Sequence, residues 1–514
     1  MRVLMLGWEF PPFIAGGLGT ACYGLTKALD RLGQEVIFVL PRAIDRVHTG
    51  AGAGGHAAHV KLLSPEPRAA ESSSRRVESF GIGSRTVKRN GADFAGQGLP
   101  PDFEPGASIE GFEHTVFRSV PASFFSPYPG GMVDAWEGSG RHWMDLLNAL
   151  AGVGVREPGA AGHAPPVLRE AAAIAGALGG TVRESAMPGV VDPSGGRGAG
   201  GGPAYDGDMM IAVERYARLV VAMCRNERFD VIHAHDWMTF PAGIALSQVA
   251  GRPLVVHVHS TEFDRAGENV NQQVYDIERR GMHASTRVIA VSELTRSICL
   301  QRYGVEGSKV EVVYNGIDTE QHQPTSEDTI QPQDKIVLFL GRITMQKGPE
   351  YFIRAAKRVL ERVKDVKFVV AGSGDMALRM IDEAAHLGIG HRVLFTGFLR
   401  GKDVDRVFQM ADVYVMPSVS EPFGIAPLEA MRNDVPVIIS KQSGVSEVLT
   451  HALKVDFWDI DEMANKIVAV LRHEPLGRTL REHGAFEVRK LTWEGAAARC
   501  TQIYERAVRI ARGG

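Results

Sequence analysis

Cysteine is scarce in this 514-residue chain, which contains four: Cys22, Cys224, Cys299 and Cys500. They lie far apart and form no CxxC pair, so neither a disulfide framework nor a cysteine-based zinc site is expected, and a reducing cytosol fits. The chain also lacks an apolar run of about 18 residues, the length that a transmembrane helix needs. The N-terminal segment "MRVLMLGWEFPPF" is interrupted by a glutamate and two prolines, which favours a buried strand over a signal peptide. The sequence therefore predicts a cytoplasmic protein without an integral membrane segment.

An excess of charge of one sign is also missing. Lys and Arg together number 57 and Asp and Glu 60, for a net charge of −3. A nucleic-acid partner is not expected, because such proteins need a basic face. The hydrophobic share of 44% and the charged share of 23% are typical of globular proteins. A chain of this length exceeds the size at which a single core stops growing, so it should form two domains. The oligomeric state stays open.

Two stretches of the chain alternate short apolar strands with amphipathic helices. The first opens with "RVLMLGW", a helical pattern ending near Gly33, and "EVIFVL", and it resumes with "DVIHAHDW", "PLVVHVHS", "RVIAVS" and "KVEVVYNGID". The second contains "KIVLFLG", "VKFVVAG", "RVLFTG", "VYVMPS", "PVIIS" and "KVDF". Alternation of this kind predicts parallel sheets with helices on both faces. We expect an α/β protein of two doubly wound, Rossmann-like domains, with a central cleft where the carboxyl ends of both sets of strands meet.

The alternation fails between about residues 45 and 205, which we interpret as a long Gly/Pro-rich insertion in the first domain. Residues 150–204 should be partly disordered, because their composition buries too little apolar area to offset the entropy of ordering. The aromatic segment 124–147 should be ordered near the cleft, either as a platform for an acceptor or as the insertion's own small core. The polar segment 319–335 predicts a linker. The expected domains are therefore 1–320 and 333–490, followed by a last helix in 491–514.

The segment "FLGRITMQKGPEYFIRAA" places two cations in a strand-turn-helix context. A strand should end at Gly341, the turn carries Arg342 and Lys347, and a helix should follow Gly348. The positive end of that helix and the two cations would converge, which suits a diphosphate whose charge must be stabilised as it departs. The alternative is that both are solvated surface charges.

The segment "SVSEPFGIAPLEAM" holds two glutamates eight positions apart. Pro427 suits the first position of a helix, which leaves the amides of Phe423, Gly424 and Ile425 ahead of it to meet hydroxyls or an anion. Glu421 and Glu429 flank this row, and such a layout fits a sugar, a diphosphate and a ribose in line. The alternative is a solvated Glu421 and a Glu429 that interacts with the helix dipole.

Two predicted strands of the first half, "DVIHAHDW" and "PLVVHVHS", contain four histidines: His233, His235, His257 and His259. Residues i and i+2 of a strand share a face, so these histidines could form a metal cluster. Parallel strands would bring such histidines to the cleft in any case, and no third ligand type is evident, so no metal is expected. Gly372, within "AGSGD", is expected in the loop near a nucleotide base.

The paired glutamates resemble the E-x7-E signature of the retaining GT-B glycosyltransferases, and the resemblance covers most of the chain outside about 45–205. "VVYNGID" and "GVSEVL" also match. "LTWEGAAARCTQIYERA" resembles the family's last helix, which crosses back to the first domain. "PPFIAGGLG", "IHAHDWMT" and "HVHSTEFDR" are most similar to the glycogen and starch synthase branch and its sucrose-handling relatives.

The resemblance implies a role for each matching residue. Glu421 would contact hydroxyls of the donor sugar, and Glu429 those of the ribose. Arg342 and Lys347 would hold the diphosphate and neutralise the leaving group. The remaining residues come from the first domain: Gly16 and Gly17 would let the backbone approach the phosphates, His259 would face the donor sugar, and Asp236 would lie at the cleft.

The activity implied is retaining transfer of a hexose, expected to be glucose, from a donor of the UDP- or ADP-glucose class to an α-glucan or another glycan. No cofactor or metal is expected. Ile14 stands where glycogen synthases have a lysine that touches the donor, so ADP, UDP and GDP all stay open. Three alternatives also stay open: a transferase for surface polysaccharide or glycolipid, a sugar-nucleotide epimerase of the same fold, and a non-catalytic sugar-binding scaffold.

Overall fold

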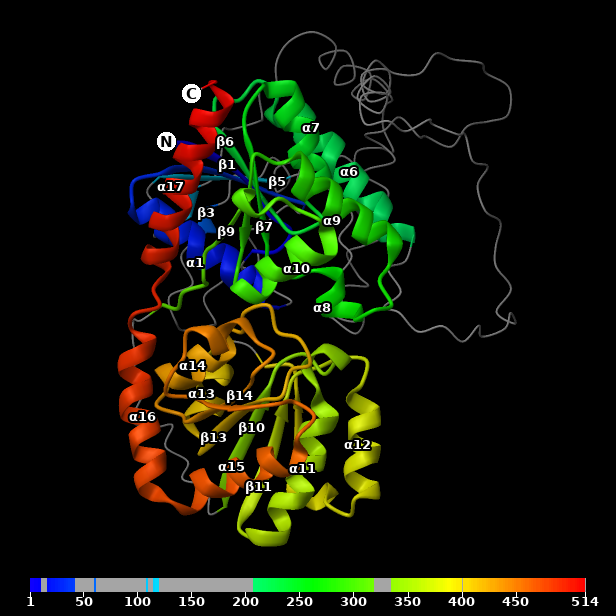
Figure 1. Ribbon diagram of the computed structural model, residues 1–514, viewed down its shortest axis with the longest axis vertical. Helices are drawn as coiled ribbons and strands as arrows, with labels where there is room; N and C mark the ends of the chain where they lie inside the picture. The colour runs from blue at the N-terminus through cyan, green and yellow to red at the C-terminus, as the bar shows by residue number, and fades with distance from the viewer. Residues whose placement is uncertain are drawn as a thin grey trace, which may run out of the picture.

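The computed structural model describes residues 1–10, 16–41, 60–61, 108–109, 114–119, 207–318, 334–399 and 401–513. The aromatic segment 124–147, the Gly-rich segment 150–204, the linker residues 319–333 and Ile14 lie outside them. The described chain forms two α/β halves, the N-terminal one in the upper part of Figure 1 and the C-terminal one below it. Among the helices so described, none is both long enough and apolar enough to cross a membrane.

The N-terminal half is built on a seven-stranded parallel sheet in the order β5-β2-β1-β6-β7-β8-β9. Helices α1 and α17 pack on one face, and α6, α7 and α9 on the other (Figure 1). Residues Val3–Leu6 are completely buried, as expected for a strand covered on both faces. The strands are β1 (Arg2–Leu6), β2 (Glu35–Leu40), β5 (Thr115–Ser119), β6 (Val231–His235), β7 (Leu254–Val258), β8 (Arg287–Ala290) and β9 (Val310–Val312). The helices are α1 (Gly17–Arg31), α6 (Gly207–Cys224), α7 (Phe240–Ala250), α8 (Glu262–Ala266), α9 (Gln272–Ala284), α10 (Glu293–Tyr303) and, from the end of the chain, α17 (Trp493–Ala511).

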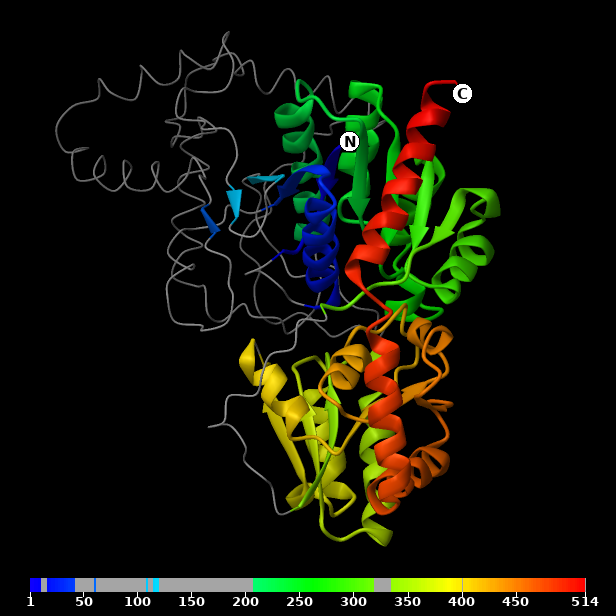
Figure 2. The ribbon, with the colours of Figure 1, turned by 90° about the vertical axis from the view of Figure 1, so that its left-hand side faces the viewer.

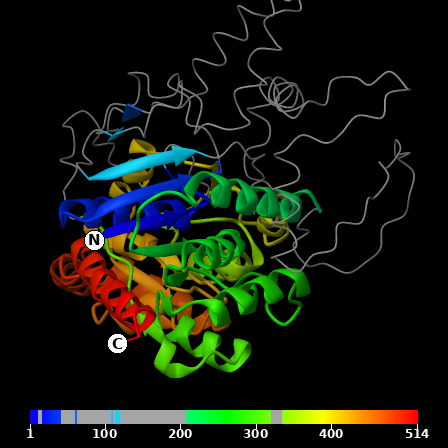
Figure 3. The same cartoon turned by 90° about the horizontal axis from the view of Figure 1, so that it is seen from above.

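One strand of this sheet was not anticipated from the sequence. β5 lies inside the predicted insertion and pairs in parallel with β2 at the sheet edge, the cyan strand beside the blue ones in Figure 3. Asp30 of α1 anchors it by accepting a hydrogen bond from the Thr115 hydroxyl at 2.8 Å. A separate two-stranded pair joins β3 (Val60–Lys61) to β4 (Ser108–Ile109). Part of the region between 45 and 205 therefore belongs to the main sheet.

The C-terminal half contains a six-stranded sheet in the order β12-β11-β10-β13-β14-β15. Alternate residues of its strands enter two separate cores: Val337, Phe339 and Phe368 pack with α11 and α15, whereas Leu338 and Tyr414 pack with α13 and α14. The strands are β10 (Lys335–Leu340), β11 (Val366–Ala371), β12 (Val393–Gly397), β13 (Val413–Met416), β14 (Val437–Ser440) and β15 (Leu453–Val455). The helices are α11 (Pro349–Arg362), α12 (Ala377–His386), α13 (Lys402–Gln409), α14 (Ala426–Arg432), α15 (Ile460–Arg472) and α16 (Glu474–Val488). The predicted class, two doubly wound domains, is confirmed.

The chain passes between the halves twice, and the two connections touch. The Ile317 amide donates to the Leu491 carbonyl at 2.9 Å, where the forward connection meets the return into α17. A Cβ at Gly316 would lie 2.3 Å from the Thr492 carbonyl carbon, so the two backbones approach closely only because this residue is glycine. α17 then runs along the N-terminal half, and its Trp493 and Tyr504 join the buried core there (Figure 2).

Candidate active site

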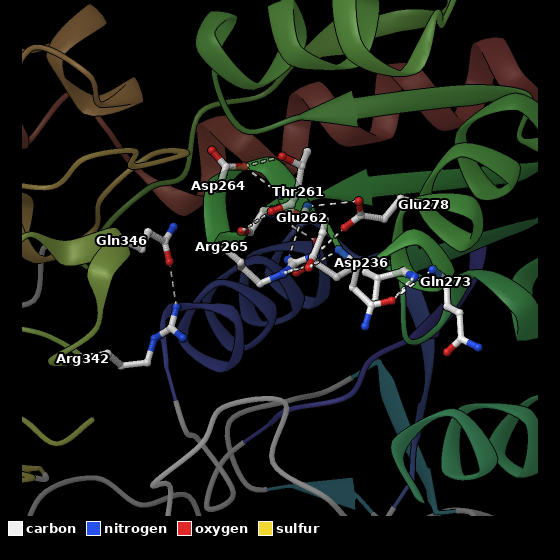
Figure 4. Close-up of polar contacts among 12 residues, drawn as sticks. Asp236, Thr261, Glu262, Asp264, Arg265, Gln273, Glu278, Arg342 and Gln346 are labelled. Carbon is white, nitrogen blue, oxygen red and sulfur yellow. Dashed lines mark hydrogen bonds and ion pairs between the residues drawn. The ribbon is translucent and has the colours of Figure 1, made fainter. Parts of the chain in front are cut away.

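The two predicted cations lie at the carboxyl end of β10. Arg342 follows the strand, and its guanidinium donates to the Gln346 side chain at 3.2 Å (Figure 4). The short 3-10 helix η4 (Met345–Lys347) follows. Gly348, with a positive φ of 62°, separates it from α11 and caps both helices. The Lys347 ammonium lies 2.5 Å from a carboxylate oxygen of Glu421. The strand-turn-helix context is therefore as predicted, and one of its cations is paired with one of the two glutamates.

Glu421 lies in the loop between β13 and α14, residues 417–425, here called the Glu421 loop. Its side chain is buried, and the oxygen that meets Lys347 also accepts a hydrogen bond from the Ser418 hydroxyl at 3.0 Å. Gly424 has a φ of 100°, which favours glycine. In the part of the chain that the structure describes, the amides of Phe423, Gly424 and Ile425 have no hydrogen-bond acceptor. The loop can therefore offer both a carboxylate and backbone donors to a ligand.

Glu429 occupies the first turn of α14, whose second residue is Pro427, one position later than predicted. Its carboxylate is half-buried, and burial raises its pKa, which the nearby Arg432 opposes. Glu429 lines a cavity of about 190 Å³ together with Lys27 and Asp318, between α14, α1 and the connection between the halves. The two glutamates thus lie in different surroundings, one against a lysine and the other facing the N-terminal half.

Gly372 follows β11 and has a structural role of its own. A Cβ at this position would lie 1.9 Å from the Gly341 carbonyl oxygen, and its φ is 149°. Only glycine lets the loops after β10 and β11 approach so closely. This packing accounts for the residue whether or not a nucleotide base lies beside it.

Asp236 and His259 directly follow two neighbouring strands of the N-terminal sheet, β6 and β7. The Asp236 carboxylate accepts hydrogen bonds from the amides of His259 at 2.7 Å and Ser260 at 3.3 Å. Asp236 itself has a φ of 58°, an uncommon conformation that aspartate tolerates better than most residues. The residue therefore fixes the turn that carries His259. Gly16 precedes α1, and at Gly17 a Cβ would meet no described atom within 4 Å, so no packing there requires glycine.

The four histidines form a stack on one face of β6 and β7. His235 and His257 are register partners, and Nδ1 of His235 is hydrogen-bonded to Nε2 of His259 at 2.9 Å. At the far end, Nδ1 of His233 is hydrogen-bonded to the Tyr504 hydroxyl of α17 at 2.7 Å. Burial lowers the pKa of all four, to about 3 for His233 and for His259. The imidazoles are therefore neutral at physiological pH, in contrast to the ion pair of Lys347 and Glu421 in the C-terminal half.

A buried ion network beside this stack was missed by the sequence analysis. Arg265 of α8 is paired with Glu262 at 3.0 Å and with Glu278 of α9 (Figure 4). Glu278 also accepts a hydrogen bond from the Tyr303 hydroxyl. The signal for the helix was present, since Thr261 and Asp264 have the spacing of a capping box and form one. The pairing of Arg265 with a glutamate 13 residues away carries no such local signal.

Comparisons with known proteins agree with this architecture. Residues 323–485 match the family model "Glycosyl transferases group 1", 136–321 match "Glycosyltransferase Family 4", and 2–87 match "Starch synthase catalytic domain". An uncharacterized glycosyltransferase of Methanocaldococcus jannaschii is 33% identical over 302 residues, which cover 55% of this chain and 77% of the relative. The chain belongs to the GT-B glycosyltransferases. The prediction that the chain is a GT-B glycosyltransferase is therefore confirmed.

Two further proteins show the range of this glycosyltransferase's relatives. A glycogen synthase of Mycobacterium tuberculosis strain H37Rv is 28% identical over 300 residues, covering 55% of this chain and 70% of the relative. A crystal structure of HepE from Anabaena in complex with UDP-glucose is 15% identical, with a TM-score of 0.56 over 98% of this chain and 100% of the other. At that identity, the second likeness bears on the fold alone.

Proposed function

We propose that this glycosyltransferase is a retaining hexosyltransferase that moves glucose from a nucleotide-diphosphate sugar to a glycan acceptor. The observation that carries the proposal is the pair of Lys347 and Glu421, 2.5 Å apart, with Arg342 in the same strand-turn-helix segment. The match to a starch synthase catalytic domain and the glycogen synthase among the relatives support glucose and a glycan. The Anabaena neighbour, which shares the fold, was solved with UDP-glucose, a donor of the class proposed here.

In this proposal the C-terminal half holds the donor. Arg342 and Lys347 bind the diphosphate and stabilise the charge that develops on it as it leaves. Glu421 exchanges its contact with Lys347 for hydroxyls of the donor sugar once the diphosphate neutralises the lysine. Glu429 accepts hydrogen bonds from the ribose hydroxyls. The amides of the Glu421 loop donate hydrogen bonds to the part of the donor that lies between the two carboxylates.

The N-terminal half contributes neutral groups. The uncharged imidazole of His259 hydrogen-bonds a hydroxyl of the donor sugar, and Asp236 keeps the turn of His259 in place. The backbone at Gly16 and Gly17 approaches the phosphates from the start of α1. A neutral surface suits the sugar, which carries no charge. No metal cofactor is proposed, because Arg342 and Lys347 supply the positive charge that the diphosphate needs.

Retention is proposed to follow a same-face reaction through an oxocarbenium-like transition state. The bond between the anomeric carbon and the phosphate oxygen breaks as the acceptor hydroxyl oxygen bonds to the same face of that carbon. The acceptor's proton passes to the departing diphosphate. Lys347 and Arg342 stabilise both the departure and the negative charge that makes the diphosphate a base.

The proposal is tested by incubating the protein with ADP-, UDP- and GDP-glucose and the matching galactose donors, without an acceptor and with glycogen, maltooligosaccharide or a polyprenyl-diphosphate sugar. Transfer that yields an α-linked product from an α-linked donor, read by NMR of the anomeric proton, is the expected result. Transfer only to a polyprenyl-diphosphate sugar would replace the glycan acceptor by a lipid-linked one. Epimerised nucleotide sugar formed without an acceptor, or no turnover of any donor, would overturn the proposal. For substitution of Lys347, Lys441→Ala is a matched control. Lys441 also pairs with a carboxylate, that of Asp456 at 2.8 Å, but it is exposed.

A further inference from the structure

The Glu421 loop is contacted by the N-terminal half on both sides of Glu421. Just before it, the Ser420 hydroxyl donates to a carboxylate oxygen of Asp264 in α8, at 2.6 Å. Just after it, the Pro422 carbonyl accepts from the Thr295 hydroxyl in α10, at 3.4 Å. The residue expected to meet the donor sugar is therefore flanked by two contacts that cross between the halves.

Asp264 is held firmly where it meets Ser420. Its other carboxylate oxygen accepts from both the amide and the hydroxyl of Thr261, each at 2.7 Å. The side chain is buried, and it lies at the start of α8, which begins three residues after His259. The Asp264 carboxylate thus caps the helix that follows His259 and also accepts a hydrogen bond from the loop that carries Glu421.

Glu447 makes the reciprocal contact from the C-terminal half. It lies in the 3-10 helix η6 (Gly444–Glu447), and its two carboxylate oxygens accept from the amides of Glu293 at 2.9 Å and Leu294 at 2.7 Å. These amides begin α10, and a carboxylate at the positive end of a helix is favourable. An acidic side chain of each half therefore accepts hydrogen bonds from the other half.

η6 is joined directly to the Glu421 loop. The Gly444 amide donates to the Glu421 carbonyl at 2.9 Å, and the Val445 amide to the Phe423 carbonyl at 2.8 Å. No side chain fits at Gly444, where a Cβ would lie 2.2 Å from the Pro422 carbonyl oxygen and 2.4 Å from Cβ of Ser292. The start of α10, η6 and the Glu421 loop consequently form one tightly packed unit, so a shift of α10 is transmitted to Glu421.

We propose that Asp264 and Glu447 are positioning residues that fix the Glu421 loop only when the two halves are docked. Their contacts hold Glu421 from both sides in the place where it meets Lys347. Separation of the halves removes both supports at once, so the carboxylate is set for the donor sugar only in the docked state. The inference deepens the proposed function and rests on it for the role of Glu421.

The test compares Glu447→Ala, Glu447→Gln and Ser420→Ala with a matched control, Glu487→Ala. Glu487 accepts from the amides of Thr450 and His451 at 2.8 and 2.9 Å, which is the same bidentate arrangement, but entirely within the C-terminal half. We expect Glu447→Ala and Ser420→Ala to lower kcat about tenfold or more, with UDP affinity within about twofold, because the side chains proposed to bind the diphosphate and ribose, Arg342, Lys347 and Glu429, all lie in the C-terminal half. Glu447→Gln keeps one acceptor oxygen and should recover part of the loss.

Hydrogen exchange supplies a readout that does not depend on activity. In Glu447→Ala without any substrate, peptides spanning 418–425 and 293–295 should exchange faster, whereas in Glu487→Ala they should exchange as in the wild type. Unchanged exchange in 418–425 in both Glu447→Ala and the milder Ser420→Ala would overturn the positioning role. So would equal losses of kcat and UDP affinity, or a loss that Glu487→Ala reproduces. If the wild type transfers no sugar, the proposed function fails, but the exchange result still decides whether these residues fix the loop.

Discussion

The strand ends of the N-terminal half carry a stack of buried, neutral imidazoles, whereas the strand ends of the C-terminal half carry an ion pair. His233, His235 and His259 are uncharged because burial lowers their pKa. In the C-terminal half, Lys347 and Glu421 form an ion pair. The two halves have the same architecture, a parallel sheet with helices on both faces, so this difference comes from a few residues at the strand ends rather than from the fold.

The difference suggests that the two halves interact with different parts of a nucleotide-sugar donor. A diphosphate is highly charged, and it can be desolvated only where opposite charges meet it. A hexose is neutral and needs hydrogen bonds without net charge. We therefore expect charge to matter in the C-terminal half and shape and hydrogen bonding to matter in the N-terminal half, and substitutions can test each expectation.

The largest effect is expected at Lys347. Lys347→Ala removes the positive charge proposed to stabilise the leaving group, and it leaves the buried Glu421 without its ion-pair partner. We expect kcat to fall by roughly 10²–10³, as loss of a group that stabilises developing charge typically does. Initial rates with saturating donor check this, and Arg342→Ala should lower kcat in the same direction. Activity near that of the Lys441→Ala control would show that the diphosphate is held elsewhere.

The glutamates should separate by the step that they affect. Glu421→Ala is expected to lower kcat by about 10², because its carboxylate is proposed to act at the sugar. Glu429→Ala should instead weaken binding of the free nucleoside diphosphate, by about tenfold, because it is proposed to hold the ribose. Calorimetric titration with UDP and with ADP measures the second effect. Normal nucleotide binding by Glu429→Ala would rule out the ribose assignment.

The same comparison shows where sequence reasoning succeeded. The strands of the C-terminal half were predicted within a few residues, because "KIVLFLG", "VKFVVAG" and their neighbours are continuous apolar runs separated by amphipathic helices. Arg342 and Lys347 were expected to follow the first of these strands, and they do. Local pattern sufficed because each feature depends on residues close together in the sequence.

The N-terminal half was less predictable. β5 is five residues long, lies far along the chain from its partner β2, and is preceded by a region without helical periodicity, so nothing local marks it as part of the sheet. The contacts of Asp264 with Ser420 and of Glu447 with α10 join residues more than 150 positions apart. Such contacts depend on how the halves dock, and a single sequence carries no period or motif for that.

A smaller effect is expected at His259. His259→Ala should lower kcat about tenfold, since it removes one neutral hydrogen bond to the sugar, whose net worth is about 0.5–1.5 kcal/mol. UDP affinity should be unchanged, because UDP carries no hexose. Steady-state kinetics with UDP inhibition as a second measurement separates the two. A loss as large as that of Lys347→Ala would mean that His259 acts on charge, and the contrast between the halves would fail.

The smallest effect is expected at Asp236, which sharpens the contrast most. Asp236→Asn keeps an oxygen that accepts from the His259 amide, and asparagine tolerates the positive φ, so kcat should stay within about threefold of the wild type.

Burial raises the pKa of Asp236 to about 7, above its unfolded value, so the stability contributed by its protonated form is lost as the pH rises through that pKa. Asparagine does not titrate. The difference in melting temperature between Asp236→Asn and the wild type should therefore shift in favour of the variant as the pH rises from about 5 to about 8. Asp236→Ala, which removes the acceptor as well, should be less stable at both pH values. A drop in kcat for Asp236→Asn comparable to that of Glu421→Ala would show that the N-terminal half also depends on charge.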